Sequence, residues 1–568
     1  MVFLKEKIRE LVAKAATQKF PGELLDIKVE YPGDPSHGDY SSNVALDLGK
    51  KMKMNPRALA QELAQMIQKP EWIEKIETAG AGFLNFYLAP KFFEDFLDEV
   101  KKAGDDYGKS EVGKGKTVVT DTSHPNVAKP MGVHHLLSTI IGNAISRILA
   151  AVGYTVVRDN YLGDYGTQFG KLLYAYKTWG DEATVKKDPI PELLKLYVKF
   201  HEEVEKDEQL EDKGRAEFKK LEQGDAQNRK LWKWVVELSL QEFQKIWDRL
   251  DVSFDFIHGE SFYEDKMQAI VDMGTSRGIF VKGEKGALIA PLKDPNIPPC
   301  IIQKSDGASL YATRDLARIQ YWEETWHPVL MLNVVDMAQE LYFRQLFEVT
   351  GMLKLTEARN LHIAFGRMRF PEKRMSTRKG DIILLEELLD EAQALALKIV
   401  EEKNPDLPAA AKKEVAKKVG VGSVKYAVLA QNRLTDVTFT WDKMLSLEGN
   451  SAPYLQYAYA RAKSILRKGS EKRSGKMALL HEPAELALAR LLPKFPEVVA
   501  LSAAEFKPNL IANYLFELAS RFSSFYAACD VLNAEPEVRE ARLKLVEAFT
   551  VVTKNGLKLL GIQVNEEM

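Results

Sequence analysis

Residues 117–158, TVVTDTSHPNVAKPMGVHHLLSTIIGNAISRILAAVGYTVVR, contain the pattern that decides the fold. A short apolar strand pattern at 117–121 is followed by a loop with two prolines, then by a helical pattern at about 133–149 and by a second strand pattern that begins at Tyr154. Strand, loop, helix and strand in this order are typical of a parallel sheet covered by helices. We therefore expect an α/β core with a Rossmann-like, doubly wound parallel sheet.

The alternation of strand and helix patterns resumes further along the chain. Strand patterns recur at residues 300–302, 329–332 and 361–365. We interpret them as further strands of the same sheet, because helices separate the successive strands of such a sheet. A charged helical stretch precedes them, so the predicted core domain covers residues 113–407 and carries a helical insertion at about 180–295.

Two further domains are expected on either side of this core, because 568 residues exceed what one hydrophobic core usually holds. Residues 1–112 combine helical patterns with short strand patterns and indicate an α+β domain. Beyond residue 408 the patterns are helical throughout. Between Ile511 and Phe525, apolar side chains recur mostly three or four positions apart, as on the buried face of a bundle helix. An all-α domain is therefore expected at 408–568.

The composition excludes several classes of protein. Hydrophobic residues make up 45% of the chain and charged residues 28%, and no apolar run approaches the roughly 18 residues that a membrane span needs. The first residues, Met1 to Lys7, become charged at once and continue as an amphipathic helical pattern, unlike a signal peptide. Cys300 and Cys529 are the only cysteines, which excludes a disulfide framework and a cysteine-rich zinc site and indicates a cytoplasmic protein.

Polar and basic side chains gather in the loop between the first strand and the first helix of the core. His124, Asn126, Lys129, His134 and His135 lie there, and they include three of the nine histidines of the chain. The N-terminus of a helix presents unpaired backbone N–H groups and the positive end of the helix dipole, so it readily binds anions. The loop is therefore a candidate phosphate or ribose site. The formal net charge of −2 by itself does not favour nucleic acid binding.

Three stretches carry a family resemblance. Residues 123–142, SHPNVAKPMGVHHLLSTIIG, resemble the arginyl-tRNA synthetase form of the first class I signature, and residues 160–170, NYLGDYGTQFG, resemble the segment that follows it. Residues 374–380, RMSTRKG, resemble the second class I signature. Further resemblances lie at 37–43, 81–86 and 452–461. The resemblance implies a class I enzyme that activates arginine with ATP and esterifies it onto tRNA, with 113–407 as its catalytic domain.

The same resemblance implies a site for ATP and the catalytic groups. The implied ATP-binding residues are Gly132, Val133, His134, His135, Met375 and Ser376, and the implied catalytic residues are His135, Lys129, Arg374, Arg378 and Lys379 together with His124 and His134. The family pattern of histidine, apolar residue, glycine and histidine is altered here, because the first histidine is missing. We hypothesise that His124 or His134 donates to the triphosphate in its place. The alternative is a catalytically inactive relative that still binds tRNA.

Arginine recognition requires carboxylates that accept the planar guanidinium fork. By resemblance, Asp315 and Tyr311 contact the guanidinium together with Asp121, which replaces a glutamate, and Asn126 and Gln339 hold the α-amino and carboxylate end. Lysine cannot satisfy two carboxylates in a fork, and an unpaired buried acceptor costs about 1–3 kcal/mol. A class I synthetase for another amino acid is the second alternative.

The remaining expectations concern the tRNA and the metal. By resemblance, Phe83 and Asn85 contact the D-loop of the tRNA, the N-terminal domain is an appended tRNA-binding domain, and the helical domain at 408–568 reads the anticodon. ATP is expected to arrive with Mg²⁺, and no structural metal held by the protein is expected. The partners are tRNA(Arg), L-arginine and ATP, no membrane is involved, and we expect a monomer.

Overall fold

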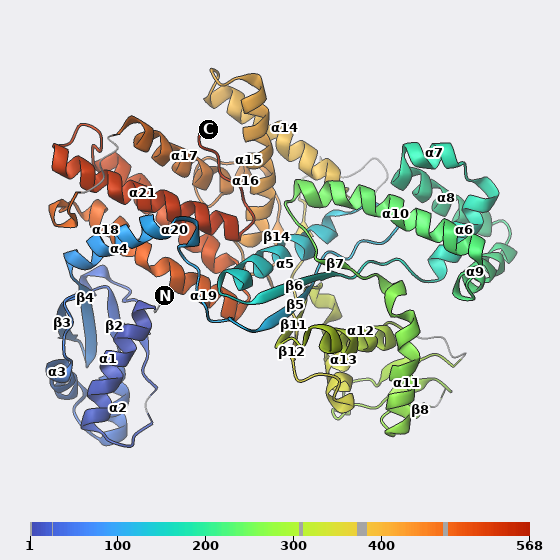
Figure 1. The fold of residues 1–568 in the computed structure, drawn as a ribbon, viewed down its shortest axis with the longest axis horizontal. Helices are drawn as coiled ribbons and strands as arrows, with labels where there is room; N and C mark the ends of the chain where they lie inside the picture. Colours follow the sequence, from blue (N-terminus) through green and yellow to red (C-terminus); the bar gives the residue numbers. More distant parts are fainter. Residues whose placement is uncertain (1–2, 25, 284, 306–309, 372–382, 470–474) are drawn as a thin grey trace.

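A parallel sheet forms the centre of the computed structural model, which describes residues 3–24, 26–283, 285–305, 310–371, 383–469 and 475–568. Its strands are β5 (Thr117–Asp121), β6 (Thr155–Asn160), β7 (Phe256–Ile257), β11 (Leu330–Asn333) and β12 (Arg359–His362). They are hydrogen-bonded in the order β12-β11-β5-β6-β7, and every neighbouring pair is parallel. Figure 1 shows this sheet between the lobes of the molecule, and its order confirms the doubly wound core.

Helix α5 (Val133–Ala151) connects β5 to β6 and is buried over almost its whole length. One side packs against the sheet, and the other contacts helices of the C-terminal region. A helix that is apolar on nearly every side must be buried in this way, since no face of it favours water. Helix α5 is therefore held between the sheet and the C-terminal helices.

The chain leaves the sheet twice between β6 and β11. The first excursion, at the right of Figure 1, consists of α6 (Thr167–Trp179), α7 (Glu182–Lys187), α8 (Pro189–Val204), α9 (Gln209–Glu222) and α10 (Ala226–Arg249). The second, below it, contains α11 (Met267–Ser276), β8 (Val281–Lys282), β9 (Leu288–Ala290) and β10 (Cys300–Gln303), followed by α12 (Tyr311–Trp326). Helix α13 (Glu340–Leu353) follows β11.

One strand prediction is corrected here. The strand predicted at 300–302 exists as β10, but it belongs to a separate antiparallel sheet of order β10-β9-β8 and not to the parallel sheet. The apolar run does not specify its partner, because a run this short fits either kind of sheet equally well. The insertion between the parallel strands is therefore not wholly helical.

The N-terminal region is an α+β unit. It contains α1 (Leu4–Lys19), β1 (Val29–Glu30), β2 (Tyr40–Ser42), α2 (Val44–Met52), α3 (Pro56–Met66), β3 (Ile73–Ala79) and β4 (Phe83–Leu88), with an antiparallel sheet of order β1-β2-β4-β3. The next helix, α4 (Pro90–Ala103), packs against the C-terminal helix α21, and Asp98 pairs with Lys544 at 2.7 Å. Helix α4 is therefore anchored on the C-terminal region.

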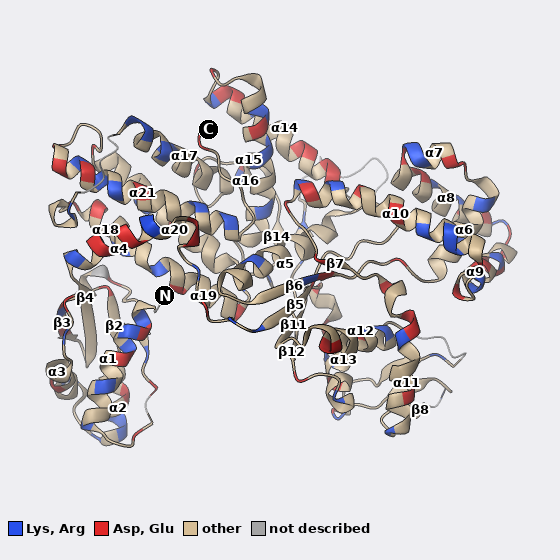
Figure 2. Ribbon diagram, in the orientation of Figure 1, with Lys and Arg blue, Asp and Glu red and all other residues tan. Residues whose placement is uncertain are grey.

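The C-terminal region is a helix bundle. Its helices are α14 (Leu385–Lys403), α15 (Ala409–Leu429), α16 (Trp441–Met444), α17 (Ala452–Lys468), α18 (Pro483–Leu491), α19 (Phe495–Glu505), α20 (Asn509–Ala528) and α21 (Pro536–Leu559). Helical patterns were predicted throughout this region, but the structure contains a short strand as well. This strand, β14 (Val437–Thr438), pairs with β13 (Met368–Arg369). Such a short strand leaves no periodicity in the sequence. Figure 2 shows residues of both signs interspersed along the helices.

Candidate active site

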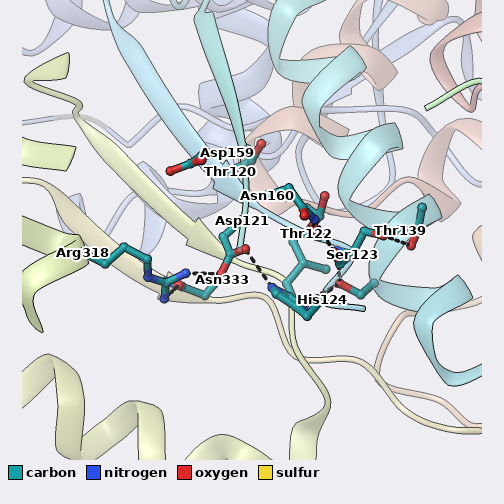
Figure 3. Close-up of polar contacts among 12 residues, drawn as sticks. Thr120, Asp121, Thr122, Ser123, His124, Thr139, Asp159, Asn160, Arg318 and Asn333 are labelled. Carbon is teal, nitrogen blue, oxygen red and sulfur yellow. Dashed lines mark hydrogen bonds and ion pairs between the residues drawn. The ribbon is translucent and has the colours of Figure 1, made fainter. Parts of the chain in front are cut away.

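Polar side chains meet at the carboxyl ends of two neighbouring strands. Asp121 is the last residue of β5 and Asn333 the last of β11, and the two strands pair in parallel with these residues in register. The chain leaves β5 toward β6 on one side and reaches β11 on the other, so the order of the strands reverses here. Ligands of open α/β sheets bind in the crevice at such a point. Figure 3 shows Asp121, His124, Arg318 and Asn333 converging there.

The loop after β5 has a strained backbone at Ser123, whose φ of 61° is left-handed. Its neighbours compensate. The backbone N–H of Ser123 donates to Ser138 Oγ at 3.0 Å, and its own Oγ accepts from Thr139 Oγ1 at 2.8 Å and from Trp247 Nε1 at 3.0 Å. A strained residue persists only where its surroundings hold it, and such residues concentrate at functional sites. The strand-to-helix loop is therefore rigidly placed.

Backbone hydrogen bonds join the first two segments that carry the family resemblance and tie the first to the chain at residue 383. Val127 N donates to Gly163 O at 3.0 Å, and Gly163 N donates to Pro125 O at 3.1 Å, which ties the first segment to the second. Val133 N donates to Ile383 O at 3.0 Å, which ties the N-terminus of α5 to the chain just after the third segment. The predictions at Arg374, Met375, Ser376, Arg378 and Lys379 fall outside the described residues.

His135 is a buried, neutral hydrogen-bond donor at the start of α5. Its Nδ1 accepts from the backbone N–H of Gly132 at 3.1 Å, so the proton of the neutral ring lies on Nε2. Burial, reinforced by the nearby His134 and His124, lowers its pKa to about 3. His134 lies beside it with 3.9 Å between the ring centroids, and it is exposed.

His124 points elsewhere, into the crevice beside Asp121. Its Nε2 lies 2.8 Å from Asp121 Oδ1, and its Nδ1 lies 3.5 Å from Ser138 Oγ. The Nζ of Lys129 lies over the ring of Tyr197 in α8, 5.1 Å from the centroid. The three histidines of the loop are thus divided between two places.

A cavity of about 330 Å³ opens at this crevice. Its lining includes all five residues predicted to bind arginine: Asp121, Asn126, Tyr311, Asp315 and Gln339. His124, Tyr161, Glu260, Arg318 and Tyr342 also line it. Tyr311 and Asp315 reach it from successive turns of α12, because residues four apart share one face of a helix.

Glu260 is a carboxylate of this cavity that the sequence analysis did not predict. It lies shortly after β7, at the same edge of the sheet, and this position after a strand was its one signal in the sequence. Burial raises its pKa to about 7, against the effect of Arg314, whose Nη1 is 3.5 Å from its Oε1. The cavity is therefore acidic and desolvated.

Phe83 and Asn85 line a second cavity, of about 420 Å³, in the N-terminal region. Phe83 is 40% exposed, whereas Asn85 is buried, and its Oδ1 accepts from Ser41 Oγ at 2.8 Å. Among the described residues, no cluster of three or more histidine, cysteine or acidic side chains is arranged for a metal ion. Within the same residues, no helix is both long and apolar enough to cross a bilayer.

Comparisons with known proteins identify the family. Residues 99–441 match the tRNA synthetases class I (R) catalytic domain, residues 455–568 the DALR anticodon binding domain, and residues 3–88 the arginyl tRNA synthetase N-terminal domain. The arginine–tRNA ligase of Fusobacterium nucleatum is 43% identical over 577 residues, with both chains fully covered. That of Clostridium kluyveri is also 43% identical, over 99% of this chain and all of its own.

Solved structures agree with the sequence relatives. The arginyl-tRNA synthetase of Thermus thermophilus has a TM-score of 0.83 at 27% identity, and that of Plasmodium falciparum has a TM-score of 0.84 at 25% identity. Each comparison covers the whole of both chains. With its sheet order, its paired signatures and its full-length relatives, this chain belongs to the arginyl-tRNA synthetase family.

Proposed function

We propose that this protein activates L-arginine with ATP and transfers the arginyl group to tRNA(Arg), releasing AMP and pyrophosphate. The observation that carries this proposal is the position of the acidic cavity. It lies at the carboxyl ends of the parallel strands, and Asp121 and His124 on its wall are in the loop that leads to the N-terminus of α5. A cationic amino acid and an anionic nucleotide then meet at the same edge of the sheet.

The amino acid occupies the cavity with its guanidinium toward α12. Asp315 accepts from the guanidinium beside Tyr311, and Asn126 and Gln339 hold the α-amino and carboxylate groups. Asp121 contributes its negative charge to the same cavity. A lysine ammonium ion would leave part of this acceptor set unpaired, and buried groups without partners give strong discrimination.

The nucleotide lies against the start of α5. Gly132 and Val133 offer their backbone to the adenine, and the Nε2–H of His135 with the exposed His134 donates to the phosphates. Met375 and Ser376 complete the nucleotide site, and the cations Arg374, Arg378, Lys379 and Lys129 balance the charge of the pyrophosphate. ATP brings its Mg²⁺ as part of the substrate.

The reaction has two steps. The carboxylate of arginine attacks the α-phosphorus of ATP in line, so a new P–O bond forms as the bond to pyrophosphate breaks. A ribose hydroxyl of the terminal adenosine of the tRNA then attacks the adenylate carbonyl and displaces AMP. The protein positions the reactants and stabilises the charge that develops on the phosphates.

The outer regions bind the tRNA. The cavity beside Phe83 and Asn85 has an aromatic side chain at its mouth, as suits an unstacked base of the D-loop. We assign residues 1–112 to this appended domain, 113–407 to the catalytic domain with its insertion at about 180–295, and 408–568 to the anticodon-binding bundle. The protein acts as a monomer in the cytoplasm.

The test is arginine-dependent ATP–pyrophosphate exchange with and without total tRNA, with lysine as the control amino acid. Exchange that requires both arginine and tRNA is expected. A folded protein that binds tRNA but exchanges with no amino acid would instead be the inactive relative. Exchange with a different amino acid would identify another class I specificity.

A further inference from the structure

A buried arginine already belongs to the cavity that receives the substrate. Arg318 lies on α12, and only 3% of its side chain is exposed. Its guanidinium carbon lies 4.5 Å from the ring centroid of Tyr161 and 4.7 Å from that of Trp322, so the planar group is held between two aromatic rings. This guanidinium is fixed before any ligand arrives.

Its hydrogen bonds go to the residues at the strand ends. Nη1 donates to Asp121 Oδ2 in a close ion pair, and Nη2 donates to Asn333 Oδ1 at 2.8 Å. The other oxygen of Asp121 lies 2.8 Å from His124 Nε2, and Asp121 itself is buried. Figure 3 shows His124 and Arg318 approaching this carboxylate from two sides. Both oxygens of Asp121 therefore already have partners.

Asp315 differs from Asp121 in this respect. Its Oδ2 accepts from the hydroxyl of Tyr342, but its Oδ1 is buried without a hydrogen bond from the residues that the structure describes. The nearest cationic group is Nη2 of Arg318, at 3.4 Å from Oδ1. A buried carboxylate oxygen without a donor is costly, and a ligand that donates to it would relieve this cost.

Charged groups of both signs lie in and beside the cavity. Asp121, Asp315 and Glu260 supply three carboxylates, while Arg318 and Arg314 supply two guanidinium groups next to them. Without Arg318, Asp121 would be a buried charge paired only with a histidine.

We propose that Arg318 is a positioning residue that removes Asp121 from direct substrate binding and leaves the open oxygen of Asp315 to receive the guanidinium of arginine. This inference rests on the proposed activation of arginine. Arg318 acts through the two carboxylates that it contacts and not on the reacting atoms. It holds them at a fixed distance, so the cavity accepts one guanidinium in one orientation.

The experiment compares Arg318→Ala and Arg318→Lys with the wild-type protein in exchange assays that contain tRNA. We expect Arg318→Ala to raise the KM for arginine about 10- to 100-fold, which is the cost of lost hydrogen bonds between charged groups. The KM for ATP should stay within about twofold, since its site lies at the start of α5. Added guanidinium ions should fill the space left by the side chain and restore much of the activity.

Two variants serve as controls. Arg158→Ala removes another guanidinium group, which pairs with Asp255 at 2.8 Å and lies outside the cavity. This variant should keep the wild-type KM for arginine and should not respond to added guanidinium ions. Arg318→Lys keeps the charge but cannot donate to Asp121 and Asn333 in the same forked arrangement, so its arginine KM should rise by less. If Arg318→Ala does not fold, Arg318→Lys still allows the positioning role to be tested.

The possible outcomes distinguish a failure of the positioning role of Arg318 from a failure of the proposed function. An unchanged arginine KM in a folded Arg318 variant would overturn the positioning role. A parallel rise in the KM values for arginine and ATP, without any response to guanidinium ions, would show a merely structural arginine. A wild-type protein that does not exchange with arginine would overturn the proposed function itself, whatever the variants do.

Discussion

The backbone N–H of Val133 donates to the carbonyl oxygen of Ile383 at 3.0 Å. This bond and its neighbour, from Leu385 N to Met131 O at 2.9 Å, join the first turn of α5 to the chain that follows residues 374–380. These bonds hold Ile383 and Leu385 beside the helix N-terminus that we assign to ATP.

Removing a cation of the second signature, residues 374–380, should slow the first step. In Arg378→Ala and in Lys379→Ala we expect the kcat of exchange to fall about 100-fold, the usual cost of one group that stabilises developing charge. Arg369→Ala is the control, because Arg369 is exposed and pairs with Asp436 at 2.6 Å. Exchange rates equal to those of the control would contradict the assignment.

The histidines of the loop should differ in which substrate they affect. His134 lies at the start of α5, so His134→Ala should lower the rate or weaken ATP binding. His124 contacts Asp121, so His124→Ala should raise the arginine KM about tenfold through the loss of one charged hydrogen bond. Separate titrations of arginine and ATP measure both effects. His327→Ala, at an exposed position, is the control, and normal kinetics in His124→Ala and His134→Ala alike would remove both roles.

The parts of the fold that could be predicted are those whose secondary structure follows from the local pattern of apolar residues. Residues 117–158 specify strand, loop and helix by their own periodicity, so β5, α5 and β6 could be located from the sequence alone. The sheet of β10 could not, since a short apolar run does not specify its partner strand. Nor could the contact of Arg318 with Asp121, which joins α12 to β5 across almost two hundred residues and exists only in the folded protein. Asp315 and Tyr311 were found by family resemblance, because their spacing alone describes any helix face.

The N-terminal cavity predicts an effect on tRNA and not on arginine. Phe83→Ala should remove one stacking surface, and stacking of a base on an aromatic side chain is worth about 1–3 kcal/mol. We therefore expect the KM for tRNA in aminoacylation to rise about tenfold with little change in the KM for arginine. Leu24→Ala removes a side chain that is 95% exposed in the same domain but outside the cavity, and it should change neither value. Equal tRNA KM values for the two variants would contradict the contact.

A buried lysine joins three parts of the chain. Lys425 of α15 donates from Nζ to the carbonyl oxygen of Leu250, after α10, and to that of Gly561, after α21, at 2.6 Å for the latter. Burial, with a smaller effect of the nearby Arg147, lowers its pKa from 10.5 to about 7, against the attraction of Asp251. The ends of two helices therefore depend on one ammonium group that releases its proton easily in the folded protein.

This lowered pKa predicts how stability should change with pH. Between about pH 7 and pH 10.5 the unfolded chain binds more protons at Lys425 than the folded protein does, so stability rises with pH by up to about 1.4 kcal/mol per pH unit. The methionine of Lys425→Met cannot titrate. The urea midpoint of the wild-type protein, relative to that of the variant, should therefore increase between about pH 7 and about pH 9. Lys558→Met, at an exposed lysine, should keep the wild-type dependence. A constant difference between the urea midpoints of wild type and Lys425→Met across this range would contradict the lowered pKa. It would show that Lys425 keeps its proton in the folded protein, because hydrogen bonds to the two carbonyl groups offset the cost of burying its charge.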